Sequence, residues 1–275
     1  MLAAVPFATA PDGPRIAFDE EGEGPALVLL AGSLGDRSQW RRAGYVDAFR
    51  SIARVISVDP LGRGESDAPH DPSLYGIERH AGEVLAVLDT LGVDRATVWG
   101  HSFGGRVGFE LAARHPERTV ALIATGASGH GLSPFARALV ESADALVRHG
   151  LPAAVERYAQ AVDVPDWMRE NWARGDAEAL AASLRANARY GGADDAFASL
   201  AVPVLLLAGE TDPVIVQARE TAERVPRCVL VELEGLDHVS SFTRSDIACA
   251  LALEFVRDLW FTEGKSPGGD NPVEK

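Results

Sequence analysis

A single serine stands between two glycines where an apolar, strand-like run gives way to a helix-like run. The segment reads Gly100-His101-Ser102-Phe103-Gly104. Helix interiors tolerate glycine poorly, whereas a sharp bend usually needs it. The pattern is the G-x-S-x-G nucleophile elbow, in which a tight turn pushes the serine hydroxyl out above a sheet. We predict that Ser102 is a catalytic nucleophile; the alternative is a simple glycine-rich turn.

A serine hydroxyl is a poor nucleophile unless a base activates it, and a histidine held by a carboxylate can do so. In elbow-type enzymes these residues follow in the order Ser, Asp or Glu, His. Asp212 and His238 each lie just beyond an apolar run, where the sites of α/β proteins gather. We therefore predict a catalytic triad of Ser102, Asp212 and His238. Glu210 remains the alternative acid, and a solvated loop residue is the alternative for His238.

The oxyanion of such a reaction needs N–H donors. The first expected donor is the backbone N–H of Phe103, directly after the serine. The second should come from the loop after the first central strand, which reads AGSLGD over 31–36. We predict the N–H of Ser33 in this role, with Leu34 next. A phosphate-binding loop is the alternative, but neither G-x-x-x-x-G-K-[ST] nor G-x-G-x-x-G is present.

Short apolar runs alternate with amphipathic ones along the chain, which indicates an α/β fold. The strands and helices of that fold would position these residues. Most of the runs are apolar throughout, as expected for strands covered on both faces. The predicted strands are 25–32, 53–60, 95–100, 119–126, 202–209 and 227–235, with 15–22 as an antiparallel edge strand. The predicted helices are 79–91, 104–115, 214–225 and 244–260.

One stretch breaks this alternation, because no convincing strand occurs between about 130 and 199. Its helix-like pieces at 134–149, 152–162 and 177–190 indicate a helical insertion between two strands. The segment 164–172, VPDWMRENW, is expected to be a loop or a short helix over the mouth of the site, or part of the core of the insertion. The polar tail 262–275 contains glycine and proline and is predicted to be disordered.

The overall composition excludes several classes of function. The net charge of −14 argues against nucleic-acid binding, which needs a basic face. No apolar run is long enough to span a membrane, and the first residues do not resemble a signal peptide. Both cysteines, Cys228 and Cys249, are expected to be buried thiols, which favours a cytoplasmic location.

Taken together, these motifs resemble the α/β-hydrolase superfamily from about residue 15 to 261. The resemblance rests on GHSFGG, on AGSLGDRSQW (31–40), on DPLGRGESD (59–67), which matches the family's D-x-x-G-x-G-x-S segment, and on the positions of Asp212 and His238. It implies a mostly parallel eight-stranded sheet flanked by helices, with a helical cap inserted after the sixth strand. The expected division is a core of 1–129 and 200–261 and a cap of 130–199.

One departure from the family pattern concerns Ala31-Gly32, where many members carry His-Gly. The GSLG that follows resembles the loop of 3-oxoadipate enol-lactonases, which also lack that histidine. Ser102 itself excludes haloalkane dehalogenases and soluble epoxide hydrolases, which use aspartate there. The resemblance implies substrate contacts in the cap and the oxyanion loop, for which the candidates are Leu34, Trp167, Met168 and Trp172, with Phe135 and Tyr190 as further large cap side chains. Each cap residue has simple packing as its alternative.

These observations predict a serine hydrolase that cleaves a carboxylic ester or lactone of a small organic molecule. No cofactor, metal, nucleic acid or membrane partner is expected, and the protein is expected to be a monomer or a homodimer. The alternatives are a carbon–carbon bond hydrolase, a cofactor-free oxygenase, and a ligand-binding protein that turns over slowly. Fold alone does not separate these reactions.

Overall fold

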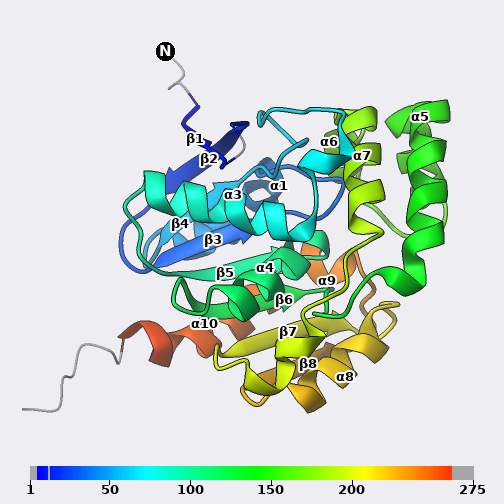
Figure 1. Ribbon diagram of the computed structural model, residues 1–275. Coiled ribbons are helices and arrows are strands. Elements are labelled where there is room, and N and C mark those ends of the chain that lie inside the picture. Colours follow the sequence, from blue (N-terminus) through cyan, green and yellow to red (C-terminus); the bar gives the residue numbers. More distant parts are fainter. Residues whose placement is uncertain (1–4, 12, 262–275) are drawn as a thin grey trace, which may run out of the picture.

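A single mixed sheet runs through the computed structural model, which describes residues 5–11 and 13–261 (Figure 1). The predicted disorder of 262–275 lies outside these residues. Within them the strand order is β1-β2-β4-β3-β5-β6-β7-β8. The strands are β1 (Phe7–Thr9), β2 (Arg15–Glu21), β3 (Ala26–Leu30), β4 (Arg54–Val58), β5 (Ala96–His101), β6 (Thr119–Thr125), β7 (Val204–Gly209) and β8 (Cys228–Leu233).

The sheet is antiparallel at one side and parallel through the rest. Strand β2 pairs antiparallel with both β1 and β4, and all pairs from β4 to β8 are parallel. The prediction of 15–22 as the edge strand was wrong, because β1 lies outside it. A three-residue strand is too short to leave a periodic signal in the sequence.

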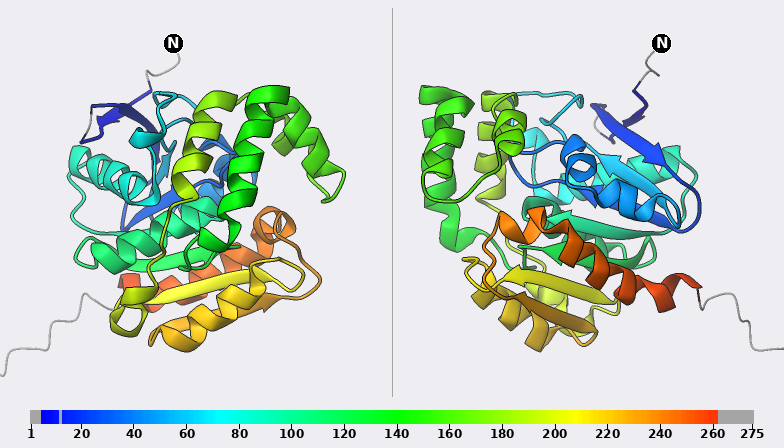
Figure 2. Two further views of the ribbon diagram at one scale, coloured as in Figure 1. Left: turned by 45° about the vertical axis from the view of Figure 1, so that its right-hand side comes forward. Right: turned by 180° about the vertical axis from the view of Figure 1, so that it is seen from behind.

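Helices cover both faces of the sheet, which explains why the central strands are apolar throughout (Figure 2). On one face α3, α4 and α8 pack on the strands, and on the other α1, α2 and α10 do so. The bounds are α1 (Ser38–Arg42), α2 (Tyr45–Phe49), α3 (Ile77–Thr90), α4 (Phe103–Arg114), α8 (Ile215–Arg224), α9 (Ser240–Thr243) and α10 (Ser245–Phe261). None of the helices in the described ranges is both long and apolar enough to cross a membrane.

The four predicted core helices, 79–91, 104–115, 214–225 and 244–260, correspond to α3, α4, α8 and α10 within two residues at each end. The short helices α1, α2 and α9 were not predicted. Helices of four or five residues carry too few turns for an amphipathic pattern to appear.

Helical segments also fill the chain between β6 and β7. They are η2 (Ser133–Phe135), α5 (Ala136–Ala159), α6 (Asp166–Trp172), α7 (Ala177–Asn187) and η3 (Asp194–Ser199). A further short helix, η1 (Pro72–Leu74), lies earlier in the chain, between β4 and α3. Helices α5 and α7 lie side by side at one end of the sheet (Figure 1). The two helices predicted at 134–149 and 152–162 form α5, which is interrupted at Gly150 with a φ of 76°. Glycine adopts this left-handed conformation without a steric penalty.

The turn between β5 and α4 is packed too tightly for side chains at its glycines. A Cβ atom at Gly104 would lie 2.1 Å from the carbonyl oxygen of Leu30, and one at Gly100 would lie 2.1 Å from the carbonyl carbon of Gly104. Both obstacles are backbone atoms, which cannot move aside alone. The two glycines therefore let α4 start directly against β3 and β5.

Replacing Gly104 with alanine should lower the free energy of unfolding by about 3 kcal/mol, because the new methyl group overlaps the backbone of β3. Gly82→Ala is the matched control in helix α3, where the nearest atom to a new Cβ is 3.9 Å away. That change should raise the free energy of unfolding by up to about 1 kcal/mol. Urea unfolding of both variants measures this contrast. Equal effects at the two positions would contradict the proposed packing constraint.

Candidate active site

Ser102 lies at the turn between β5 and α4 in a strained backbone conformation. Its φ is 52° and its ψ is −109°, and among the described residues it is the only non-glycine with a positive φ. A residue with a Cβ rarely adopts such a conformation, and it persists where the surrounding structure enforces it. The conformation matches the strained elbow that the G-x-S-x-G pattern predicts.

Two side chains from separate loops form a hydrogen-bonded line with this serine. The Oγ of Ser102 lies 2.9 Å from Nε2 of His238, and Nδ1 of His238 lies 2.8 Å from Oδ2 of Asp212. Asp212 follows β7 and His238 follows β8, so the group lies beyond the carboxyl ends of three parallel strands. The structure thus brings together the three residues that the sequence singled out.

The alternative acid, Glu210, is engaged elsewhere. Its Oε2 accepts a hydrogen bond from the backbone N–H of Gly235 at 3.1 Å, and its side chain is exposed. Asp212 instead is only 2% exposed, and its Oδ1 accepts from the N–H of Val214 at 3.0 Å. The geometry favours Asp212 over Glu210 as the partner of His238.

Asp212 is surrounded in a way that stabilises its charged form. Burial raises the pKa of its carboxyl, but the hydrogen bond and charge of His238 and the N–H of Val214 outweigh this effect, so the pKa lies below its usual value. Gly126, with a φ of 59°, allows the close approach. A Cβ at this position would lie 3.0 Å from Nδ1 of His238 and 3.1 Å from Oδ2 of Asp212.

His101 supports the site, although no sequence pattern indicates this role. Its Nε2 donates to the backbone carbonyl of His238 at 3.2 Å, and its ring packs between His238 and Phe242 with centroid distances of 5.1 and 4.8 Å. Burial, and then the charge of His238, lower its pKa to about 3. His101 therefore stays neutral and holds the backbone that carries His238. Only the fold reveals this contact, which joins residues 137 positions apart.

The expected oxyanion donors lie near the serine and are free to act. A Cβ at Gly32 would lie 3.6 Å from the Cβ of Ser102, so the loop after β3 passes directly beside the elbow. The backbone N–H groups of Ser33, Leu34 and Phe103 donate to no other described residue. N–H groups without a protein acceptor beside a serine can receive an oxyanion.

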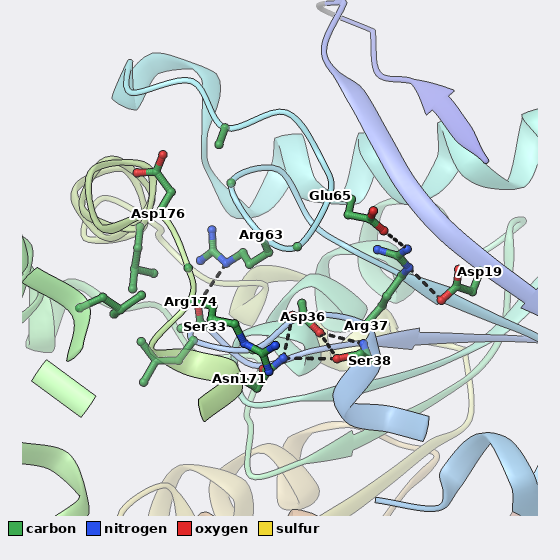
Figure 3. A pocket seen from close by; sticks show the side chains of 18 residues that line it. Asp19, Ser33, Asp36, Arg37, Ser38, Arg63, Glu65, Asn171, Arg174 and Asp176 are labelled. Carbon is green, nitrogen blue, oxygen red and sulfur yellow. Dashed lines mark hydrogen bonds and ion pairs between the residues drawn. The ribbon is translucent and has the colours of Figure 1, made fainter. Parts of the chain in front are cut away.

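A buried arginine joins this loop to the insertion. Arg63 donates from Nε to the carbonyl of Ser33 at 3.0 Å (Figure 3). It also donates from Nη2 to Oγ of Ser183 in α7 at 3.2 Å. Its guanidinium lies 5.1 Å from the centroid of the Phe103 ring. The side chain is 5% exposed, and no carboxylate in the described ranges lies within 4 Å of it. Arg63 thus contacts both residues that carry expected oxyanion donors.

A cavity of about 460 Å³ lies between the loop after β3 and helices α6 and α7 (Figure 3). Leu34, a candidate for substrate contact, lines this cavity together with Ser33 and Arg63. Across it, Nδ2 of Asn171 in α6 donates to Oδ2 of Asp36 at 2.7 Å. The insertion is therefore fixed to the loop after β3 at two separate points.

A second cavity, of about 710 Å³, contains Ser102, Asp212 and His238. Its walls are largely apolar and come from the loops after β6 and β7 and from helix α5. The residues of the insertion that line it are Leu132, Phe135, Ala138, Leu139, Ser142, Tyr158, Ala161 and Val162. Because these side chains share a cavity with the serine, they are the stronger candidates for substrate contact.

The structure does not bring Trp167, Met168 or Trp172 to the cavity of Ser102. Met168 and Trp172 are buried among apolar side chains, which matches the packing alternative. Trp167 lies beneath the guanidinium of Arg42 at 5.3 Å. Tyr190, also named from the sequence, is buried and donates to Glu110 at 3.0 Å. The size of a cap side chain does not distinguish packing from substrate contact.

Comparison with known proteins places the chain in a family. A family model described as alpha/beta hydrolase fold matches residues 25–171, more than half of the chain. The chain belongs to the α/β-hydrolase family, and it is a hydrolase of that fold.

Individual relatives differ in the reactions that their names state. The chain is 31% identical over 245 residues to "Putative carbamate hydrolase RutD" of Pseudomonas savastanoi pv. phaseolicola, covering 82% of this chain and 90% of that protein. It is 39% identical over 119 residues to 2-hydroxymuconate semialdehyde hydrolase of Pseudomonas putida, covering 42% of this chain and 41% of that one. The enol-lactonase of Burkholderia xenovorans LB400 superposes with a TM-score of 0.82 at 27% identity. The match covers 92% of this chain and 100% of the enol-lactonase chain.

Replacing His101 with glutamine should make the protein less sensitive to acid. Between the folded pKa of about 3 and the ordinary value of 6.5, the unfolded chain binds a proton at His101 that the folded chain excludes. The free energy of unfolding therefore falls as the pH drops through this window. Without His101, the loss between pH 7 and pH 5 should be smaller by about 2 kcal/mol.

Urea unfolding of the wild type and His101→Gln at both pH values measures this difference. His149→Gln, at an exposed position in α5, is the control for loss of a histidine as such. The same loss of stability in wild type and His101→Gln would show that His101 is not held neutral.

Proposed function

We propose that the protein is a serine hydrolase that cleaves carboxylic esters or lactones. The observation that carries the proposal is the line from Ser102 through His238 to Asp212 at the carboxyl edge of the sheet. A hydroxyl within hydrogen-bond reach of an imidazole, which a buried carboxylate orients, is the arrangement that activates a serine. A mechanism that uses these three side chains requires no cofactor or metal.

The proposed reaction starts with proton transfer from Oγ of Ser102 to Nε2 of His238 as Oγ attacks the carbonyl carbon. Asp212 accepts the Nδ1 proton of His238 in a hydrogen bond, which fixes the tautomer and stabilises the imidazolium. His238 then protonates the leaving alkoxide, and an acyl-enzyme remains. Water, deprotonated by His238, then attacks the acyl carbon. The bond to Oγ breaks, His238 returns the proton to Oγ of Ser102, and the acid is released.

The N–H groups of Phe103 and Ser33 are proposed to donate hydrogen bonds to the carbonyl oxygen and to stabilise its negative charge. Both amides lack partners in the described residues, and Arg63 holds the carbonyl of Ser33 and faces the ring of Phe103. Donors fixed in advance stabilise the transition state at little reorganisation cost, and one such donor contributes roughly 3 kcal/mol.

The largely apolar cavity around Ser102 suits the acyl part of a small organic ester or lactone. The name of one relative adds carbamates as alternative substrates of the same three residues, and carbon–carbon bond hydrolysis stays an alternative from the sequence. A slow ligand-binding protein and a cofactor-free oxygenase are the remaining alternatives. Turnover with defined substrates separates them, because only a hydrolase releases many equivalents of product per enzyme.

The variant Ser102→Ala should lose at least about 10⁴-fold in kcat/KM toward p-nitrophenyl butyrate, because no acyl-enzyme can form. Release of p-nitrophenol by the wild type should continue for many turnovers. Continuous absorbance measurement checks both expectations. A single burst that ends at one equivalent would support the slow binding protein, and unchanged turnover in Ser102→Ala would refute the serine mechanism.

Asp212→Asn should lower kcat by about 10⁴-fold near neutral pH, because an amide favours the wrong tautomer of His238. Glu210→Gln is the matched control two positions away, and its exposed side chain predicts a change within about twofold. Steady-state kinetics of both variants distinguish the two acids. A large loss in Glu210→Gln with little in Asp212→Asn would reverse their assignment.

A further inference from the structure

One cation lines the cavity of Ser102. Arg106 lies in α4 one turn after the serine, and no other lysine or arginine is among the described residues that line this cavity. Its Nη1 donates to the backbone carbonyls of Ser128 at 3.2 Å and His130 at 2.9 Å. No carboxylate of the described chain lies within 4 Å of its guanidinium.

The guanidinium of Arg106 keeps donors that the fold does not use. An arginine has five N–H groups and remains charged in proteins. The two carbonyl contacts engage Nη1, whereas Nε and Nη2 donate to no other described residue. Burial lowers the pKa of Arg106, which reflects a charge that is poorly solvated and has no close counterion. A group from outside the chain can therefore gain much by pairing with it.

Arg37 shows how this fold compensates an arginine charge with carboxylates. Arg37, which is buried, forms ion pairs with three carboxylates, those of Asp19, Asp59 and Glu65. The fold thus neutralises a buried arginine where it serves the architecture alone. Removing a charge from water without a close counterion is costly, so the unused donors of the half-buried Arg106 beside a reactive serine point to a ligand.

The carboxylates of the same cavity are already engaged. Asp212 is held by His238 and Val214, as described above. Oδ1 of Asp237 accepts from the N–H groups of Val239 and Ser240 and from Oγ of Ser240. Farther along α4, Glu110 accepts from Tyr190 and lies 3.6 Å from Arg114. None of these acids is within ion-pair distance of Arg106, so its charge is open to an incoming carboxylate.

We propose that Arg106 binds a carboxylate of the substrate, so that the substrate is an ester or lactone whose acyl part carries a free acid group. The inference rests on the proposed function, because Ser102 would bond to the acyl carbon and the acyl chain would extend into the shared cavity. One helical turn separates the two residues, so a spacer of a few methylenes joins the ester to the acid. The apolar side chains of the cavity would surround that spacer.

The test compares two p-nitrophenyl esters that differ only in charge at the chain end. One is the half-ester of adipic acid, and the other is the ester of 6-methylheptanoic acid, in which an isopropyl group replaces the carboxylate. The ratio of their kcat/KM values is measured in wild type, Arg106→Met and Arg106→Lys. Arg106→Met should lower the acid-to-neutral ratio by about ten- to a hundredfold, because a charge-assisted hydrogen bond is lost.

Arg106→Lys keeps the charge without the planar fork, so its ratio should fall between the other two. Loss of the contacts to Ser128 and His130 lowers both activities together and leaves the ratio unchanged. The control is Arg114→Met on the same helix, which removes an exposed cation paired with Asp195 at 2.7 Å. Its ratio should equal that of the wild type.

An equal fall for both esters in Arg106→Met would overturn the proposal and leave Arg106 a structural residue. Where Arg106→Met does not fold, Arg106→Lys replaces it in the test. The proposal then requires a lower acid-to-neutral ratio and weaker competitive inhibition by adipate in Arg106→Lys than in the wild type, and equal values would overturn it. Failure of the proposed function gives a different result, because wild type and Ser102→Ala would then hydrolyse the neutral ester equally slowly. The two hypotheses are therefore tested separately.

Discussion

The strained turn at Ser102 is the constraint on which the rest of the site depends. A positive φ at a residue with a Cβ is unfavourable, and it persists because Gly100 and Gly104 let β3, β5 and α4 approach at backbone contact. The same turn directs the serine hydroxyl toward the loops after β7 and β8. It also leaves the first N–H of α4 without an intrahelical partner. Strain, nucleophile and anion donor thus come from one local geometry.

The surroundings of the serine hold their partners by contacts between distant segments. His101 fixes the backbone of His238, and Gly126 makes room for the contact between His238 and Asp212. Arg63 joins the loop after β3 to α7 through Ser33 and Ser183. Catalytic groups must keep their geometry within fractions of an ångström, and such supporting contacts provide that precision. The insertion therefore contributes to the geometry of the site as well as to its walls.

Charge compensation differs between the buried Arg37 and Arg63 and the half-buried Arg106. Arg37 is neutralised by three carboxylates and serves the architecture near β2 and β4. Arg63 and Arg106 have only neutral acceptors, and both lie beside groups that the proposed reaction uses. An uncompensated buried cation favours negative charge nearby, whether on a developing oxyanion or on a substrate acid. The protein has excess negative charge overall, yet it places unpaired positive charge around its serine.

The sequence by itself determined the elements and the residues whose roles follow from local rules. Apolar runs gave the six strands β3 to β8, and the elbow pattern with the strand ends gave Ser102, Asp212 and His238. Short segments such as β1, α1 and α2 left too few residues for a periodic signal. Only the tertiary structure revealed the roles of His101, Arg63 and Arg106 and the residues that form the walls of the cavity. Their importance lies in which distant groups they contact and which partners they lack, and neither is encoded in residue type or spacing.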